Sequence, residues 1–331
     1  METRIRPIDE SSLAEAKAIL ENGGVVAFPT ETVYGLGGDA RSDEAVDTIY
    51  RVKGRPADNP LIVHVHREYD LKTLICDEQP YAAKLRSRFL PGPLTLVYRS
   101  RGKVSAKVSC GLDTLAVRVP SHPGAQRFLR CVDMPIAAPS ANVSKHVSPV
   151  TAEHVYTDLQ GRIPLILDGG ACIGGIESTV CDVTGDIPVV LREGLISREQ
   201  IADVVGRCEL YVPVAGAQVR SPGMKYKHYA PACKTYLFAA DAVEEAVQKF
   251  CSCEEEGANV FALCENSVSR RFPADRVLNL GDTGEEMAAR LYALLRRGEQ
   301  VADVIVAVRP RGEDGIMAGV QNRLGKACAG E

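Results

Sequence analysis

The sequence predicts an α/β protein made of two domains that a linker joins. Short apolar runs typical of buried strands alternate with amphipathic stretches of helical period along most of the 331 residues. The pattern changes between residues 209 and 232, where three prolines interrupt any steady period. Strands and helices alternate again beyond this segment, which is typical of a small open sheet. We therefore predict a larger domain over residues 1–208, a linker over 209–232 and a small α/β domain over 233–331.

Apolar positions at spacings of three and four predict the helices, and aliphatic runs bounded by glycine or proline predict the strands. In the larger domain, helices are expected over residues 12–22, 43–51, 79–89, 123–130, 151–159 and 197–205. Strands are expected there over residues 25–28, 61–65, 94–98, 115–120, 165–167, 179–183 and 189–191, with a strand that runs into a loop over 136–142. In the smaller domain, strands are expected over 235–238, 259–263, 276–280 and 304–308, and helices over 242–250, 285–296 and 316–326.

The first candidate site follows the strand at residues 25–28. The chain breaks at Pro29 into hydroxyls, a carboxylate and glycines, which is the chemistry of a loop at a strand's end. Asp43 can cap the next helix, which ends at Gly54 and leaves Lys53 and Arg55 near its end. Two cations beside a strand-end loop indicate a site for an anionic ligand such as a phosphate ester. The alternative is that both merely complement the C-terminus of the helix.

Composition and charge restrict the class of protein. Hydrophobic residues make up 45% and charged residues 25%, as in an ordinary globular protein, and the net charge of −4 argues against a surface that coats nucleic acid. Residues 1–7 lack the apolar core of a signal peptide and no apolar run is long enough to span a membrane, so we expect a cytoplasmic protein. The 11 cysteines form no Cys-x-x-Cys pair, which favours reduced thiols over zinc sites or disulfides.

The standard nucleotide-binding loops are absent from the sequence. Residues 319–326 have the wrong spacing for a P-loop, and no Gly-x-Gly-x-x-Gly follows a predicted strand. A nucleotide could instead be bound by two polar residues two positions apart, Ser140 and Asn142. Their side chains face the same side of an extended segment. Together with Lys53 and Arg55 they could bind a nucleotide and neutralise its phosphates.

Two ionisable residues lie inside apolar strands, where each needs a partner. Arg118 could hold a substrate carboxylate through two hydrogen bonds, and His64 could contact a hydroxyl. The alternatives are a satisfied core histidine and an arginine paired with Asp or Glu. Residues 177–179 and 192–194 also lie at strand ends, and ligands of open α/β sheets usually bind in such loops.

With these segments assembled, the chain resembles the YrdC-like family, and specifically its two-domain threonylcarbamoyl-AMP synthases. The matching segments are 28–36 (FPTETVYGL), 53–61 (KGRPADNPL), 91–95 (PGPLT), 139–142 (PSAN), 177–180 (ESTV), 191–194 (LREG) and 221–231 (SPGMKYKHYAP). The resemblance implies a YrdC-like twisted mixed sheet with flanking helices, plus a smaller Rossmann-like C-terminal domain. It also implies that L-threonine, bicarbonate and ATP give threonylcarbamoyl-adenylate and pyrophosphate. The product would serve the modification of adenosine beside the anticodon in tRNA.

The resemblance also implies roles for individual residues. Threonine would be held by Thr32, His64, Arg118 and Ser178. ATP, with Mg²⁺ bound through its phosphates, would be surrounded by Lys53, Arg55, Asn59, Thr114, Ser140, Asn142, Ser148, Arg192 and Tyr229. Lys53 and Arg55 would be the catalytic cations, and a general base is not needed because a carbamate is already a nucleophile. Independently of the resemblance, His228 and Tyr229 could fold the linker over the site as a lid that retains the labile adenylate, and the alternative is a linker that is an unoccupied connector.

Two other functions fit parts of the sequence. The first is a non-catalytic RNA-binding module that uses the cleft at Lys53 and Arg55. The negative net charge and the lack of interleaved aromatic and basic residues argue against this function. The second is the YrdC-containing carbamoyltransferase of hydrogenase maturation, whose Cys-x-x-Cys segments and acylphosphatase module are absent. For the synthase, we expect a downstream tRNA-modifying transferase as partner, at most weak direct contact with tRNA, and no membrane partner.

Overall fold

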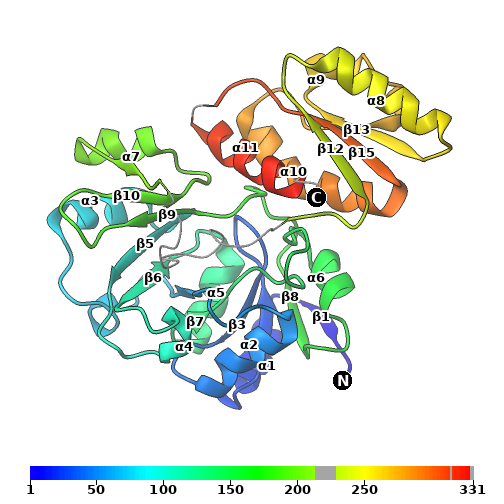
Figure 1. Cartoon of the computed structure of the whole chain (residues 1–331). Coiled ribbons are helices and arrows are strands. Elements are labelled where there is room, and N and C mark those ends of the chain that lie inside the picture. The colour runs from blue at the N-terminus through cyan, green and yellow to red at the C-terminus, as the bar shows by residue number, and fades with distance from the viewer. Residues whose placement is uncertain (213–228, 314, 329–331) are drawn as a thin grey trace.

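The structure is a computed structural model that describes residues 1–212, 229–313 and 315–328. The chain forms two α/β units that lie side by side, with about the first two thirds of the chain in the larger unit (Figure 1). The larger unit is built on an 11-stranded sheet and the smaller on a 4-stranded sheet. The predicted fold class, a mixed sheet with flanking helices and a smaller open α/β unit, is confirmed.

The larger sheet contains both parallel and antiparallel neighbours. Its strands are β1 (Arg4–Pro7), β2 (Val26–Phe28), β3 (Gly35–Asp39), β4 (Ile62–His64), β5 (Leu94–Arg99), β6 (Thr114–Arg118), β7 (Ile136–Ala137), β8 (Leu165–Asp168), β9 (Thr179–Asp182), β10 (Val189–Arg192) and β11 (Glu209–Leu210). Their order across the sheet is β1-β8-β2-β3-β7-β4-β6-β5-β9-β10-β11. The pair that carries His64 and Arg118, β4 and β6, is parallel, so both residues lie at the same edge of the sheet.

Helices cover both faces of this sheet. They are α1 (Glu10–Glu21), α2 (Asp43–Lys53), α3 (Pro80–Phe89), α4 (Ala106–Ser109), α5 (Pro123–Val132), α6 (Ala152–Leu159) and α7 (Arg198–Val205). Because side chains alternate along a strand, Val26 and Phe28 of β2 pack with α1 and α5 in one cluster, whereas Ala27 packs with α2 and α6 in another. The period of two in β2 therefore fixes the layer order helix, sheet, helix.

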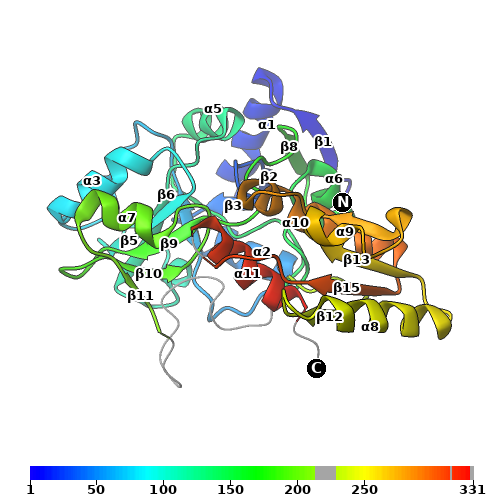
Figure 2. The ribbon, with the colours of Figure 1, turned by 90° about the horizontal axis from the view of Figure 1, so that it is seen from above.

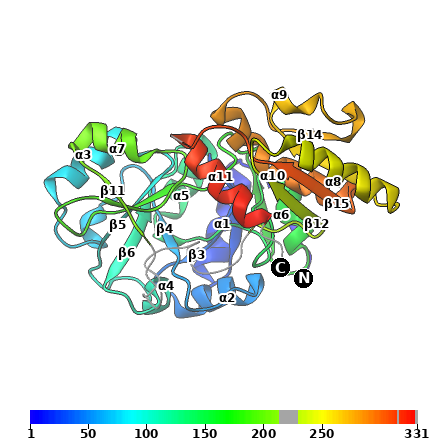
Figure 3. The ribbon, with the colours of Figure 1, turned by 45° about the horizontal axis from the view of Figure 1, so that its top comes forward.

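The smaller unit is an open parallel sheet with helices on its two faces. Its elements are β12 (Lys234–Phe238), α8 (Val243–Glu255), β13 (Val260–Cys264), α9 (Asn266–Ser269), β14 (Val277–Asn279), α10 (Gly284–Val301), β15 (Val304–Val308) and α11 (Ile316–Ala327). The strand order is β12-β15-β13-β14, and all paired strands are parallel. Figures 1 to 3 show α10 and α11 between this sheet and the larger unit, with α8 on the outer side.

One apolar core continues from the larger unit into the smaller one. Leu291 and Leu324, from α10 and α11, belong to the same buried cluster as Ile176 of the larger unit. Gly175 has a φ of +70°, and a Cβ there would lie 2.2 Å from the backbone oxygen of Ala288, so only glycine fits at this contact. The two units are therefore packed against each other as closely as the layers of one domain.

The local predictions were confirmed for most elements, but the cap of α2 was wrong, and β1, β3, β11, α4 and α9 were not predicted. Ser42, not Asp43, caps α2, and Asp43 instead accepts a hydrogen bond from Ser105. Residues 35–39, predicted as loop, form β3, because Gly35 and Gly37 let the strand lie against the ring of Phe28. Strand β1 was not predicted, since its short polar sequence has no apolar alternation.

The predicted linker, residues 209–232, falls partly on described residues. Its first residues form β11, which pairs with β10, and Tyr229 is buried. Residues 213–228, including His228, lie outside the described residues, so the path of the linker over the site stays a prediction. In the described part of the chain, no helix combines the length and the apolar character needed to cross a membrane.

Candidate active site

A cavity opens at the strand ends of the larger sheet and is bounded on one side by Tyr229. Its wall is formed by Thr30, Thr32, Val33, Tyr34, Gly35, Arg55, Pro60, Leu61, Ile62, His64, Arg118, Ala138, Pro139, Ser140, Asn142, His146, Ser148, Glu177, Ser178, Arg192 and Tyr229. The strand-end loops that the sequence singled out therefore meet at one place.

All four residues that the resemblance assigns to threonine line this cavity. Arg118 donates from Nη1 to Oγ1 of Thr32 over 2.8 Å. The hydroxyl of Ser178 lies 2.8 Å from that of Thr95 and is thereby oriented from β5. The arrangement places a guanidinium and two hydroxyls around a small space, which suits a small polar molecule with a carboxylate.

Arg118 also has a buried partner that the sequence reasoning missed. Its Nη2 lies 2.8 Å from Oε1 of Glu31, and the two side chains are 4% and 6% exposed. The alternative of an arginine paired with Asp or Glu is therefore confirmed, whereas the binding of a substrate carboxylate by Arg118 stays a prediction, for which its place in the cavity wall leaves room. The sequence feature that could have indicated a role for Glu31 is its position between two threonines in the loop after β2.

His64 is neutral in this site. Burial and the neighbouring charge of Arg118 lower the pKa of His64 to about 3. One ring nitrogen, Nδ1, lies 3.2 Å from the carbonyl oxygen of Ile62, and the ring meets Phe28 edge to face. His64 can therefore exchange a hydrogen bond with a ligand but contributes no charge.

Lys53 is not brought to the wall of the cavity. It is buried, and Nζ donates to the backbone oxygens of Ser140 and Asn142. Burial and the charge of Arg55 lower the pKa of Lys53 well below its usual value. The structure thus places this ammonium behind the 140–142 segment, where it fixes the backbone that presents the two side chains.

Arg55 faces the cavity from the segment after α2. Its guanidinium donates to the backbone oxygens of Asn59 and Pro60 over 3.1 to 3.3 Å, and within the described ranges it makes no ion pair with a carboxylate. Asn59 is buried behind the wall, and Thr114 begins β6 at the end opposite Arg118, so the cavity wall contains neither residue. Their contacts to ATP stay predictions.

The other residues assigned to ATP form one side of the cavity. They are Ser140, Asn142, Ser148, Arg192 and Tyr229. Ser148 donates to Oε1 of Glu177 over 2.7 Å, and Arg192 donates to the backbone oxygen of Ser178 over 2.9 Å. This side therefore combines hydroxyls, an amide, an aromatic ring and a guanidinium, which are the groups that recognise a nucleotide.

Glu177 connects this side to the smaller unit. It accepts hydrogen bonds at Oε2 from the hydroxyl of Tyr292 over 2.9 Å and from Nε of Arg323 over 3.0 Å. Burial alone would raise the pKa of Glu177, but the charges of Arg323 and Arg192 and the hydrogen bond from Ser148 lower it to about 2. Tyr292 and Arg323 were missed from the sequence, although a fully buried arginine within an apolar helix pattern is a signal of such a partner.

Asp158 on α6 is a second buried carboxylate at the contact between the units. Burial would raise the pKa of Asp158, but hydrogen bonds from His146 and Arg296 outweigh burial and lower the pKa to about 2. The same carboxylate and the nearby charge of Glu299 raise the pKa of His146.

We expect the contact between the two units to weaken in acid. Because the pKa values of Glu177 and Asp158 are depressed, their contribution to stability is complete above about pH 4.5 and is lost as the pH falls toward 2. Each carboxylate should contribute on the order of 2 kcal/mol. Both Glu177→Gln and Asp158→Asn should be less stable than the wild type at pH 7. Between pH 7 and 3, urea unfolding should show that each variant loses less unfolding free energy than the wild type. Parallel curves would contradict the assignment.

Comparisons with known proteins give the same picture for both units. Residues 18–194 match the family model described as "Telomere recombination" (Sua5_yciO_yrdC), and residues 196–329 match "Threonylcarbamoyl-AMP synthase, C-terminal domain". The chain is 41% identical to the threonylcarbamoyl-AMP synthase of Pyrococcus abyssi over 97% of this chain and 95% of that protein. It is also 41% identical to the synthase of Bacillus subtilis over 97% and 94%. The crystal structure of P. abyssi Sua5 complexed with L-threonine superposes with a TM-score of 0.90 at 40% identity, covering 99% of this chain and 97% of that one.

Proposed function

The chain belongs to the threonylcarbamoyl-AMP synthase family, and we propose that it makes threonylcarbamoyl-adenylate from L-threonine, bicarbonate and ATP. In the proposed reaction the threonine amine forms an N–C bond to bicarbonate carbon with loss of water. An oxygen of the resulting carbamate then attacks the α-phosphorus of ATP, and pyrophosphate leaves. The product supplies the threonylcarbamoyl group for adenosine beside the anticodon in tRNA.

The observation that carries this proposal is a single cavity whose wall contains all residues assigned to threonine and most of those assigned to ATP. On one side Arg118, with Thr32, offers a donor pair for the threonine carboxylate, while neutral His64 and Ser178 offer hydrogen bonds to its hydroxyl. On the other side stands Arg55, whose charge no carboxylate of the described residues neutralises. Two reactants held in one cavity react as if at very high effective concentration.

Arg55 is proposed as the main electrostatic catalyst. Negative charge develops on the α-phosphoryl oxygens as the carbamate attacks, and a fixed guanidinium stabilises that charge. In the proposed site, Ser140, Asn142, Ser148, Arg192 and Tyr229 hold the nucleotide. Lys53 acts on the same step through the backbone of Ser140 and Asn142.

Mg²⁺ is proposed to enter with ATP. The carboxylate of the described wall, Glu177, is paired with Arg323, so this wall supplies no free carboxylate set for a divalent ion. Within residues 1–212, 229–313 and 315–328, no three His, Cys, Asp or Glu side chains are grouped as ligands. The phosphates of ATP would therefore hold the ion, which would reduce their charge.

Pyrophosphate release tests the proposed function. The full chain should release pyrophosphate from ATP and Mg²⁺ only when threonine and bicarbonate are both present, and omission of either should reduce release to background. Release that does not depend on threonine, or none at all under these conditions, would overturn the proposal. Salt-sensitive tRNA binding without ATP turnover would then support the RNA-binding alternative.

The partners follow from the chemistry of the product. A mixed carbamic–phosphoric anhydride is a reactive acyl donor, so we propose that a tRNA-modifying transferase consumes it, with at most weak direct contact between this chain and tRNA. We also propose a cytoplasmic location, which the 11 unpaired thiols support.

A further inference from the structure

Helix α10 of the smaller unit presents a polar face to the larger unit. Tyr292, Arg296 and Glu299 are spaced by four and three residues, so they lie on one side of the helix. Tyr292 and Arg296 are buried, at 0% and 2% exposure. A buried polar helix face needs partners, and the larger unit supplies them.

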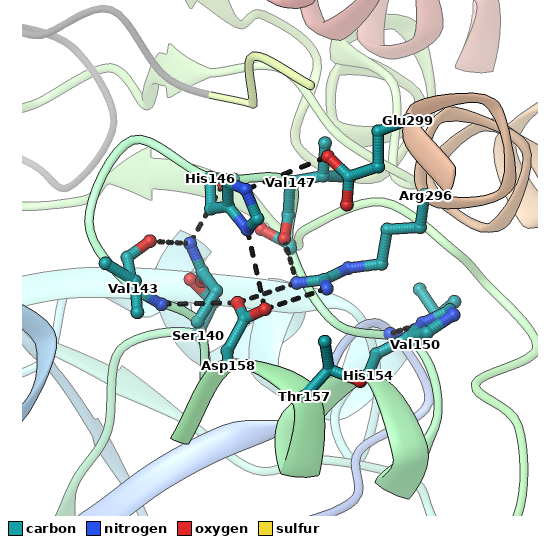
Figure 4. Close-up of polar contacts among 12 residues, drawn as sticks. Ser140, Val143, His146, Val147, Val150, His154, Thr157, Asp158, Arg296 and Glu299 are labelled. Atoms are coloured by element: carbon teal, nitrogen blue, oxygen red, sulfur yellow. Dashed lines mark hydrogen bonds and ion pairs between the residues drawn. The ribbon is translucent and has the colours of Figure 1, made fainter. Parts of the chain in front are cut away.

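Arg296 ties together both ends of the 143–147 loop. Its Nη1 and Nη2 donate to the two carboxylate oxygens of Asp158 over 3.0 and 2.9 Å, and Nη2 also donates to the backbone oxygen of Val147 (Figure 4). Asp158 in turn accepts from the backbone N–H of Val143 over 3.3 Å. The same guanidinium therefore fixes the end of the loop directly and its beginning through one carboxylate.

This loop joins two residues of the nucleotide side of the cavity. Asn142 precedes it and Ser148 follows it, and both line the cavity. The side-chain amide of Asn142 donates to the backbone oxygens of Val143 and His146 over 2.8 and 2.9 Å. His146 itself stands between two acidic residues, with Nδ1 3.4 Å from Asp158 and Nε2 3.7 Å from Glu299 of α10 (Figure 4). Displacing the loop would therefore displace Asn142 and Ser148.

A second contact reaches Ser148 through Glu177. The hydroxyl of Tyr292 donates to Oε2 of Glu177, while Ser148 donates to Oε1 of the same carboxylate. The ring of Tyr292 stacks on Tyr229, with the ring centres 5.3 Å apart. Thus Ser148 is held from both sides, by the loop that Arg296 fixes and by the carboxylate that Tyr292 orients.

We propose that α10 of the C-terminal unit positions the nucleotide side of the active site, with Arg296 and Tyr292 acting through Asp158, Val147 and Glu177 on Asn142 and Ser148. The inference rests on the proposed function and adds to it a role for the C-terminal unit: it sets the affinity for ATP. Most of the threonine side is held differently, because in the described part of the chain Arg118 contacts Glu31 and Thr32 and neither is a hydrogen-bond partner of Tyr292 or Arg296, whereas Ser178 directly follows Glu177. The effect of α10 should therefore be selective for ATP.

Matched pairs of substitutions in the full chain test this selectivity. Tyr292→Phe removes one hydroxyl and keeps the stacked ring, and Arg296→Gln removes the guanidinium. Two substitutions are the controls. Tyr236→Phe lies on the edge strand β12, where the ring is near Lys234 and Lys249, and Arg297→Gln lies at the exposed neighbour of Arg296. Outer hydrogen-bond partners of metal ligands typically contribute about 10- to 100-fold to affinity or activity. We expect the KM for ATP to rise about tenfold in Tyr292→Phe and Arg296→Gln, with the KM for threonine and both controls changed less than about twofold.

Two further measurements separate positioning from simple stabilisation. If Tyr292 acts through Glu177 on Ser148, the double variant Tyr292→Phe/Ser148→Ala should bind ATP no more weakly than Ser148→Ala alone. ATP affinity should be measured by calorimetry without threonine and bicarbonate, so that the result does not depend on turnover. Equal losses for ATP and threonine, additive effects in the double variant, or an unchanged ATP affinity in Tyr292→Phe would each overturn the inference. A wild-type protein that binds ATP but releases no pyrophosphate would instead contradict the proposed function.

Discussion

Replacing Arg55 by alanine should reduce pyrophosphate release by about 100- to 1000-fold at saturating ATP and threonine. Loss of one fixed donor to the charge that develops in a transition state costs about 2.7 to 4 kcal/mol, which corresponds to this factor. Arg55 faces the cavity and spends its hydrogen bonds on the backbone oxygens of Asn59 and Pro60, so its charge is available to a phosphate. Burial lowers the pKa of Arg55, but an arginine keeps its proton at any working pH.

The control for Arg55 lies on the same part of the chain. Arg51 is exposed on α2, and Arg51→Ala should leave the rate within about twofold of wild type. Arg55→Lys should recover part of the rate, because it restores the charge without the planar donor pair. Single-turnover pyrophosphate release, followed with thermal unfolding of each variant, makes the comparison. A folded Arg55→Ala enzyme that keeps more than about a tenth of the wild-type rate would exclude Arg55 as the main electrostatic catalyst.

The sequence was sufficient to predict the residues at strand ends, and the reason is local. An arginine in an apolar strand, at Arg118, and a hydroxyl and an amide two positions apart, at Ser140 and Asn142, are visible without any long-range information. The parallel pairing of β4 and β6 then brings His64 and Arg118 to the same edge. The period of two residues in strands and of three to four residues in helices determines on which face of its element each side chain lies. The position of the cavity follows from these faces.

The sequence was not sufficient to assign the partners of these groups. Lys53 and Arg55 are two residues apart and were predicted to act alike, yet the helix end turns the lysine into the protein and the arginine into the cavity. Nor does any local pattern join Glu177 to Tyr292, which is 115 residues further along the chain. Such contacts depend on how the two units pack against each other. The spacing of residues within one helix does not indicate which surface of the other unit the helix will contact.

Removing Arg118 should cost the protein both stability and activity, for separate reasons. In Arg118→Met the carboxylate of Glu31 stays buried without its ion-pair partner, and leaving one buried charge unpaired costs about 3 to 5 kcal/mol of unfolding free energy. The same change removes the donor that the proposed site offers to the carboxylate of threonine. Loss of a hydrogen-bonded charge contact of about 3 kcal/mol should reduce threonine-dependent pyrophosphate release by at least about 100-fold.

The double variant Glu31→Leu/Arg118→Met separates the two effects. Replacing a buried ion pair by apolar residues of similar volume is often neutral or stabilising, so urea unfolding should show most of the lost free energy restored. Activity should not return, because the guanidinium that the proposed site offers to the carboxylate of threonine is still missing. If the double variant regains both stability and threonine-dependent release, Arg118 serves only to neutralise Glu31 and another group must hold the substrate carboxylate. If it regains stability alone, the ion pair stabilises the fold and the guanidinium also recognises threonine.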